Sequence, residues 1–212
     1  MADSKDISAA QLRDRFARTA KPLDPLDVVT PRGAYSWPKG MLDGIAASLR
    51  PAGVLIPVRQ HSRGLSILLT QRSAELKHHA GQVSFPGGSM EASDGDIVDT
   101  ALRETREEIG IDESDVSIIG YLETMPTVTG YAVSPVVGLL SGAIELTIDR
   151  TEVEYTFEVP LEFLLNPANH RMVQREWRGL SFAMVEFHFE DQRIWGATAQ
   201  MMLRFINLIK KQ

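Results

Sequence analysis

The sequence predicts a mixed α/β fold of the α+β type, in which helices pack on a mixed β-sheet. Two observations carry this prediction: many short segments are rich in β-branched and aliphatic residues, and amphipathic helical patterns lie between and after them. The 212 residues are 43% hydrophobic and 24% charged, and no break in composition marks a second domain. A chain of this length can bury a sizeable core.

The predicted strands follow from these aliphatic segments. The first two, GVLIPV and LSILLTQR, are nearly continuous aliphatic runs, and the third, QVSF, is ended by a proline and two glycines. A turn, PTVTGY, separates the fourth from the fifth. In chain order the predicted strands are 53–58, 65–72, 82–85, 116–125, 132–140, 155–159 and 180–189.

The predicted helices follow from apolar residues at helical spacing. The clearest pattern is the last one, where an apolar stripe recurs at i, i+3, i+4 and i+7 and consists of Met202, Phe205, Ile206 and Ile209. The predicted helices are 7–18, 37–50, 96–109 and about 197–209.

The first fifty residues differ in character from the rest. The stretch 21–33, KPLDPLDVVTPRG, is proline-rich and is predicted to be an irregular arm. We therefore expect an N-terminal helical and irregular extension over residues 1–50, and the main domain over residues 51–212.

The composition excludes several classes of function. Cysteine is absent, so the chain has no disulfide framework and no thiolate chemistry. It has no run of about 18 apolar residues, and its N-terminus lacks the apolar core of a secretion signal. We therefore expect a cytoplasmic protein without a membrane partner. The net charge of −6 argues against a general nucleic-acid binder, and an anionic ligand would need a local cluster of basic groups.

The helix at 96–109 is locally well specified. Asp96 can cap its first turn, and Gly110 can supply the left-handed residue that ends it. On a helical wheel one face is suited to packing and consists of Val98, Ala101, Leu102, Thr105 and Ile109. The opposite face is predicted to be exposed and acidic.

Three glutamates, Glu104, Glu107 and Glu108, share an arc of about 100° on that face. Like charges at this spacing destabilise a helix, whereas a divalent cation would reverse the effect. Arg103 lies near Glu107 on the wheel and can orient its carboxylate. Taken alone, the three glutamates favour an ordinary solvated face. The glycine turn FPGG before the acidic loop and the helix favours a metal site instead.

The end of this segment resembles the box of the Nudix hydrolase family. Residues 103–111, RETREEIGI, fit its second half, with Thr105 at a position for a bulky apolar residue. In the first half Asp94 stands where the box has glutamate, and eight residues rather than seven separate it from Arg103, so Asp94 is assigned no metal. The resemblance implies a Nudix domain over 51–212, with a mixed sheet packed between helices as an α/β/α sandwich.

A second motif lies directly upstream, in LLTQRSAELKHHAGQVSFPGG from Leu68 to Gly88. It resembles the signature of the coenzyme A pyrophosphatase subgroup. Lys77 stands where that signature has arginine, which keeps the charge but loses the bidentate fork. The subgroup implies hydrolysis of the diphosphate of coenzyme A or acyl-coenzyme A. The products would be 4′-phosphopantetheine, or its acyl form, and adenosine 3′,5′-bisphosphate.

The resemblance also implies roles for single residues. Mg²⁺ or Mn²⁺ would be held by Glu104, Glu107 and Glu108, with Arg103 as their neighbour. Phosphate, and in coenzyme A the 3′-phosphate in particular, would be gripped by Arg72 and Lys77, beside the backbone turn at Gly87 and Gly88. A further acid from a later loop would be Glu152, with Glu154 as the alternative.

Two other functions stay open from the sequence. One is a Nudix pyrophosphatase for a different small molecule, such as NADH, ADP-ribose or a nucleotide. The other is a non-catalytic nucleotide-sensing protein, although the intact glutamates favour an enzyme. The sequence leaves open a homodimer, the choice between coenzyme A and its thioesters, and the number of metal ions.

Overall fold

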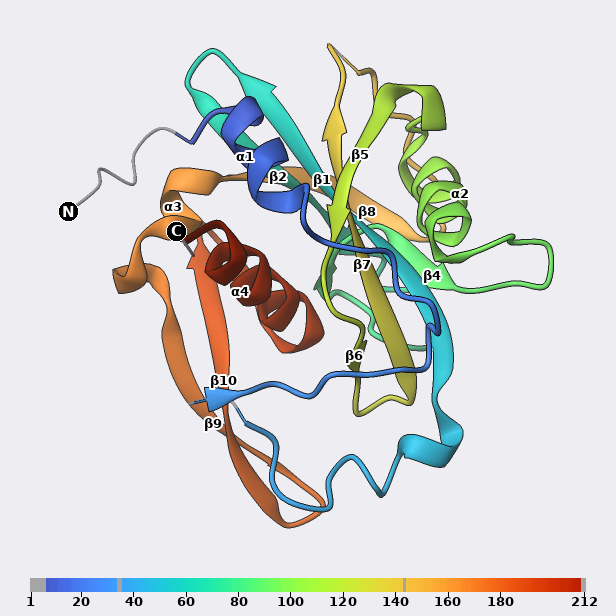
Figure 1. Cartoon of the computed structure of the whole chain (residues 1–212), viewed down its shortest axis with the longest axis vertical. Helices are drawn as coiled ribbons and strands as arrows, with labels where there is room; N and C mark the ends of the chain where they lie inside the picture. The colour runs from blue at the N-terminus through green and yellow to red at the C-terminus, as the bar shows by residue number, and fades with distance from the viewer. Residues whose placement is uncertain (1–6, 34–35, 143, 211–212) are drawn as a thin grey trace.

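The computed structural model describes residues 7–33, 36–142 and 144–210, and it has three layers (Figure 1). Helix α2 (Ile97–Ile109) covers one face of a mixed sheet, while α1 (Ala9–Phe16) and α4 (Gly196–Lys210) cover the other. The predicted mixed α/β architecture is therefore confirmed. Among the helices of the described residues, none combines the length and apolar content that a membrane crossing requires.

The main sheet has eight strands, with β3-β2-β1-β7-β5 as its path. Strand β8 pairs with β2, β4 with β1, and β6 with β7. The central pair, β1 and β7, is parallel, and the other pairs are antiparallel. The strands are β1 (Arg50–His61), β2 (Gly64–Arg72), β3 (Val83–Ser84), β4 (Gly87–Ser89), β5 (Val116–Tyr121), β6 (Met125–Pro126), β7 (Tyr131–Leu140) and β8 (Val153–Pro160).

A smaller antiparallel sheet has the order β11-β10-β9. Its strands are β9 (Arg171–Trp177), β10 (Leu180–Phe189) and β11 (Gln192–Ile194). A short helix, α3 (Leu161–Leu165), precedes it, and single 3₁₀ turns are η2 (Ala46–Ser48), η3 (Glu113–Asp115) and η4 (Pro167–Asn169). The sequence did not predict β4, β9, β11 or α3.

The predicted helix at 37–50 is wrong. The chain there forms turns and η2, and strand β1 begins at Arg50. Gly40 has φ +83°, a left-handed conformation outside the α-helical region. The proline two residues earlier also removes a backbone donor. The predicted strand at 116–125 is likewise divided, into β5 and β6, which pair with different parts of β7.

The N-terminal segment contributes to the core. Leu12 and Phe16 of α1 are fully buried, and the ring of Phe16 stacks on Phe205 of α4 with centroids 5.4 Å apart. The chain then crosses the end of β5, where the Tyr121 amide donates to Thr19 Oγ1 at 2.9 Å. These contacts hold α1 and the residues that follow it against α4 and the main sheet.

Candidate functional site

Helix α2 provides the frame of the site, and its predicted ends are confirmed. The Asp96 side chain accepts hydrogen bonds from the amides of Val98 and Asp99, at 2.7 and 3.3 Å. Gly110 has φ +73° and ends the helix. Lys21 from the N-terminal arm forms an ion pair with Asp96.

Helix α2 packs closely on β1, and this packing determines how far the side chains of α2 lie from the sheet. Ala101, Thr105 and Ile109 are fully buried, as the helical wheel predicts, whereas Val98 and Leu102 of the same predicted face are only half-buried. The backbones approach closely at Gly53, where an added Cβ would lie 2.6 Å from the carbonyl oxygen of Ile97. Only glycine at this point lets the helix lie so near the strand.

The prediction of an exposed acidic face is wrong for two of its three glutamates. The Glu108 side chain is 2% exposed and that of Glu104 is 16% exposed, whereas Glu107 is 54% exposed. Strand β4 and Arg72, at the end of β2, lie over this side of the helix. Burying two carboxylates side by side is costly unless a cation or a hydrogen-bond donor accompanies them.

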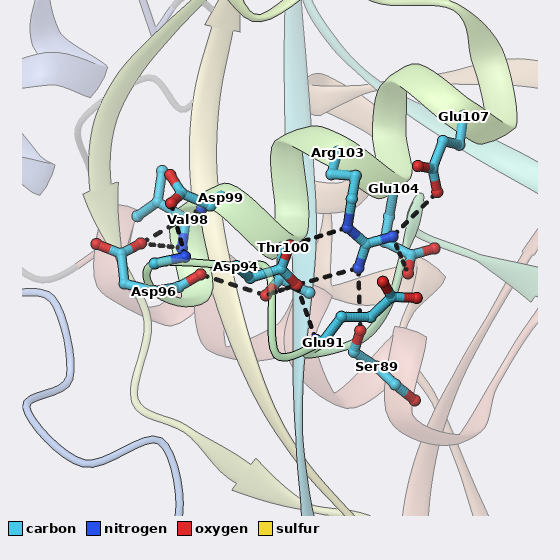
Figure 2. Close-up of polar contacts among 11 residues, drawn as sticks. Ser89, Glu91, Asp94, Asp96, Val98, Asp99, Thr100, Arg103, Glu104 and Glu107 are labelled. Carbon is cyan, nitrogen blue, oxygen red and sulfur yellow. Dashed lines mark hydrogen bonds and ion pairs between the residues drawn. The ribbon is translucent and has the colours of Figure 1, made fainter.

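Arg103 connects the carboxylates of the helix (Figure 2). Its Nη1 donates to Glu104 Oε1 at 2.9 Å and to Glu107 Oε2 at 3.0 Å. Its Nη2 also donates to the carbonyl oxygen of Ser89 at 3.1 Å, which ties the helix to the end of β4. The predicted proximity of Arg103 to Glu107 is confirmed by this contact.

Asp94 is the site residue whose role the sequence did not indicate. Both of its oxygens accept from Arg103, at 2.9 Å from Nε and 3.1 Å from Nη2. Arg103, together with hydrogen bonds from the Glu91 amide and the Thr100 hydroxyl, lowers the pKa of Asp94 to about 2. Asp94 therefore positions Arg103. The only signal was a carboxylate at the glutamate position of the box, separated from Arg103 by eight residues rather than seven.

Glu108 is a buried carboxylate with an incomplete set of partners. Arg72 Nη1 lies 3.4 Å from Glu108 Oε1, and Glu108 Oε2 has no hydrogen-bond partner within the described part of the chain. Burial raises the pKa of Glu108 to about 8, with added repulsion from Glu104 and Glu152, while Arg72 opposes the rise. Burial also raises the pKa of Glu104.

This donor set fits a hard divalent cation. Carboxylate oxygens are the ligands that Mg²⁺ and Mn²⁺ prefer, and the orphaned oxygen of Glu108 is such a donor. In the described ranges no three acidic or histidine side chains already face one another as a metal cage. Arg103 engages one oxygen of Glu104 and one of Glu107, so each carboxylate retains a second oxygen for a cation.

Strand β4 carries the two glycines of the predicted site against the glutamates. An added Cβ at Gly88 would lie 2.5 Å from the carboxyl atoms of Glu104. Gly87 has φ +150°, and a Cβ there would lie 2.4 Å from the carbonyl oxygen of Gly53. Glycine is thus required at Gly87 for β4 to lie against β1, whereas a larger residue at Gly88 would displace the carboxylate of Glu104.

The other predicted site residues differ in whether they contact the glutamates of α2. Arg72 contacts Glu108 directly. Glu152 is exposed just before β8, close enough that its charge raises the pKa values of Glu104 and Glu108. Lys77 is exposed on the loop between β2 and β3, and Glu154 is exposed on β8. No contact joins either of these two described residues to the glutamates.

Comparison with known proteins identifies relatives along most of the chain. A NUDIX domain model matches residues 49–197. A Citrobacter koseri protein named "Uncharacterized Nudix hydrolase NudL" is 39% identical over 158 residues, which cover 74% of this chain and 82% of the relative. A protein of the same name from Escherichia coli strain SMS-3-5 is 42% identical over 151 residues, covering 71% and 78% respectively.

The solved structures that resemble the chain are more distant. The crystal structure of DR0079 from Deinococcus radiodurans has a TM-score of 0.47 and 16% sequence identity, and the match covers 74% of this chain and 85% of that one.

Proposed function

Because the chain belongs to the Nudix family, we propose that this Nudix hydrolase is a divalent-cation-dependent pyrophosphatase for the diphosphate of coenzyme A or acyl-coenzyme A. The products are 4′-phosphopantetheine, or its acyl form, and adenosine 3′,5′-bisphosphate.

One observation supports this substrate most strongly. The segment that resembles the coenzyme A subgroup, Leu68–Gly88, contacts the carboxylate helix at both of its ends. Arg72 pairs with Glu108 at 3.4 Å, and Gly88 lies against Glu104. The two motifs therefore meet at the same carboxylates, which supports the proposal that they contribute to one site.

The chemistry of diphosphate hydrolysis depends on placement and charge rather than on covalent help from the protein. In this proposal Glu104, Glu107 and Glu108 hold Mg²⁺ or Mn²⁺. A cation bound there would neutralise charge on the diphosphate and lower the pKa of water.

The chain's own groups have separate tasks. Arg103, fixed by Asp94, orients the carboxylates of Glu104 and Glu107. Arg72 and Lys77 grip phosphate. Glu152 accepts the proton of the attacking water, and Glu154 is the alternative acceptor.

A substrate panel tests this function. Purified protein is incubated with Mg²⁺ and coenzyme A, acetyl-coenzyme A, NADH, ADP-ribose or a nucleoside triphosphate, and the products are separated by chromatography. We expect the highest kcat/KM with coenzyme A or its thioester, and cleavage between the two diphosphate phosphorus atoms. Faster hydrolysis of NADH or ADP-ribose would assign a different Nudix substrate. Binding without turnover of any compound would indicate a sensor.

The variant Gly88→Ala tests whether activity depends on the position of the Glu104 carboxylate, independently of the stability of the fold. The new Cβ would overlap the carboxyl group of Glu104, which is the end of a flexible side chain and can move away. We expect kcat to fall by about 10²-fold, because a displacement of about 1 Å is enough for such a loss. The melting temperature should change little. Gly44→Ala is a control for substituting a glycine, since it has no left-handed backbone conformation and a Cβ there would make only ordinary contacts, the nearest at 3.7 Å. Wild-type kcat in Gly88→Ala would show that the position of Glu104 does not matter.

A further inference from the structure

The small sheet carries a cluster of charged and aromatic side chains away from the glutamates. Its centre is Glu186 on β10, a buried carboxylate. Arg193 on β11 donates to both of its oxygens, from Nε at 3.0 Å and from Nη2 at 2.7 Å. Arg175 on β9 donates to the same carboxylate through Nη2. His188 Nε2 lies 3.4 Å from Glu186 Oε2.

The two arginines also share one aromatic ring. The Cζ atoms of Arg193 and Arg175 lie 5.2 and 5.9 Å from the centroid of Trp195, which joins β11 to α4. Contact with a ring occupies the face of a guanidinium and leaves the N–H groups at its edge available. We call Arg175, Arg193 and Trp195 the arginine–tryptophan cluster.

This cluster carries more positive charge than its one carboxylate neutralises. Two guanidiniums surround Glu186, which leaves one net positive charge, and His188 adds to it when protonated. The side chains of Arg175 and Arg193 are 37% and 46% exposed, so solvent and ligands can reach them. In a protein with a net charge of −6, such a patch is a place where an anion binds favourably.

The cluster lies beside the strands that lead into the site of the glutamates. Strand β11 packs against β3, and the Thr198 hydroxyl of α4 donates to the carbonyl oxygen of Val83 at 2.9 Å. Gln192, next to Arg193, donates to the Tyr155 hydroxyl at 3.0 Å. Tyr155 on β8 pairs with Gln71 on β2, which directly precedes Arg72. Strand β3 continues through Phe85 and Pro86 into β4.

From this arrangement we propose that Arg175, Arg193 and Trp195 form a second anion subsite, which binds the phosphate monoester that the substrate carries apart from its diphosphate. For coenzyme A this group is the 3′-phosphate, so the inference rests on the proposed function. The guanidiniums are already held by Glu186 and Trp195, so little side-chain entropy is lost when phosphate binds. Arg72, already paired with the buried Glu108, is left to serve the diphosphate.

Binding of a product and its analogue tests the subsite without turnover. Isothermal titration compares adenosine 3′,5′-bisphosphate with adenosine 5′-phosphate on wild type, Arg175→Gln and Arg193→Gln. Wild type should prefer the bisphosphate, and each variant should lose about ten- to hundredfold in affinity for it, the usual range for a charge-assisted hydrogen bond. Affinity for adenosine 5′-phosphate should stay within about twofold.

Matched variants distinguish a subsite from an ion cluster that only stabilises the sheet. Arg178→Gln removes a guanidinium that stacks on Trp177 in the same hairpin, and it should leave the preference intact. Glu186→Gln keeps both arginines and removes the competing carboxylate, so affinity for the bisphosphate should not fall. Arg193→Gln alone leaves the buried carboxylate of Glu186 without its main partner, and the double variant Arg193→Gln with Glu186→Gln removes that carboxylate as well. If this pair restores the melting temperature and the preference together, the cluster is structural and the proposal is overturned.

The kinetic arm separates failure of the subsite from failure of the proposed function. The ratio of kcat/KM for coenzyme A to that for its 3′-dephospho form should fall in both arginine variants. An unchanged ratio, or an equal loss with both substrates, would overturn the subsite while leaving the pyrophosphatase in place. If wild type hydrolyses neither compound, the proposed function is wrong, and the titrations alone then decide whether the cluster binds a phosphate monoester.

Discussion

Replacing Glu108 by glutamine should lower kcat for coenzyme A by at least ~10²-fold, the range seen when a group that stabilises transition-state charge is lost. Glutamine keeps the shape of the side chain and one oxygen, but it removes the charge that a divalent cation needs. Steady-state kinetics with saturating Mg²⁺ measures the loss. Near-normal turnover in both Glu108→Gln and Glu107→Gln would show that these carboxylates are not ligands.

The same substitution should stabilise the metal-free protein. In the folded state the pKa of Glu108 is raised from 4.5 to about 8, so between these values the folded state binds the proton more tightly than the unfolded state. Stability then falls as pH rises through this window. Glu108→Gln removes this penalty, and in EDTA its melting temperature should exceed that of wild type by more at pH 8 than at pH 5. Glu107→Gln, at an exposed position, is the control and should show little of this difference.

Removal of divalent cations should abolish hydrolysis. EDTA would leave Glu104 and Glu108 repelling each other beside the diphosphate, and added Mg²⁺ or Mn²⁺ should restore activity. Binding is measurable without turnover: at about a hundred times its Kd, a cation that binds only the folded state stabilises it by about 2.7 kcal/mol. The corresponding rise in melting temperature should be lost in Glu108→Gln. Undiminished turnover in EDTA would contradict the metal assignment.

The sequence predicted best those elements whose ends carry local signals. Helix α2 begins and ends within a residue of its predicted bounds, because Asp96 and Gly110 determine its termini through their own backbone and side-chain chemistry. The segment 37–50 does not form the predicted helix because Gly40 adopts a left-handed conformation and Pro38 lacks a backbone donor. Strand β4 was missed because its two glycines indicate a turn, and they form a strand only where β1 offers hydrogen bonds.

The candidate site was likewise predictable only where its features depend on local sequence. The crowding of Glu104, Glu107 and Glu108 on one side of a helix follows from spacing alone. The burial of Glu108 does not, because it depends on Arg72, which is far away in sequence and reaches the helix through the fold of β2. The arginine–tryptophan cluster was also unpredictable, since its two arginines come from β9 and β11, strands that the sequence did not reveal. Pairings between distant segments are decided by tertiary structure.

The parallel pairing of β1 with β7 has a consequence for how the protein acquires its structure. Arg50 pairs with Tyr131, so roughly eighty residues must close into a loop before the centre of the sheet exists. The helix with the glutamates lies within that loop and packs on β1, so its carboxylates are gathered only when the loop has closed. We expect slow refolding, with a rate that is limited by this closure. The apolar strand β1 would meanwhile be exposed to other unfolded chains, which makes the refolding yield dependent on protein concentration.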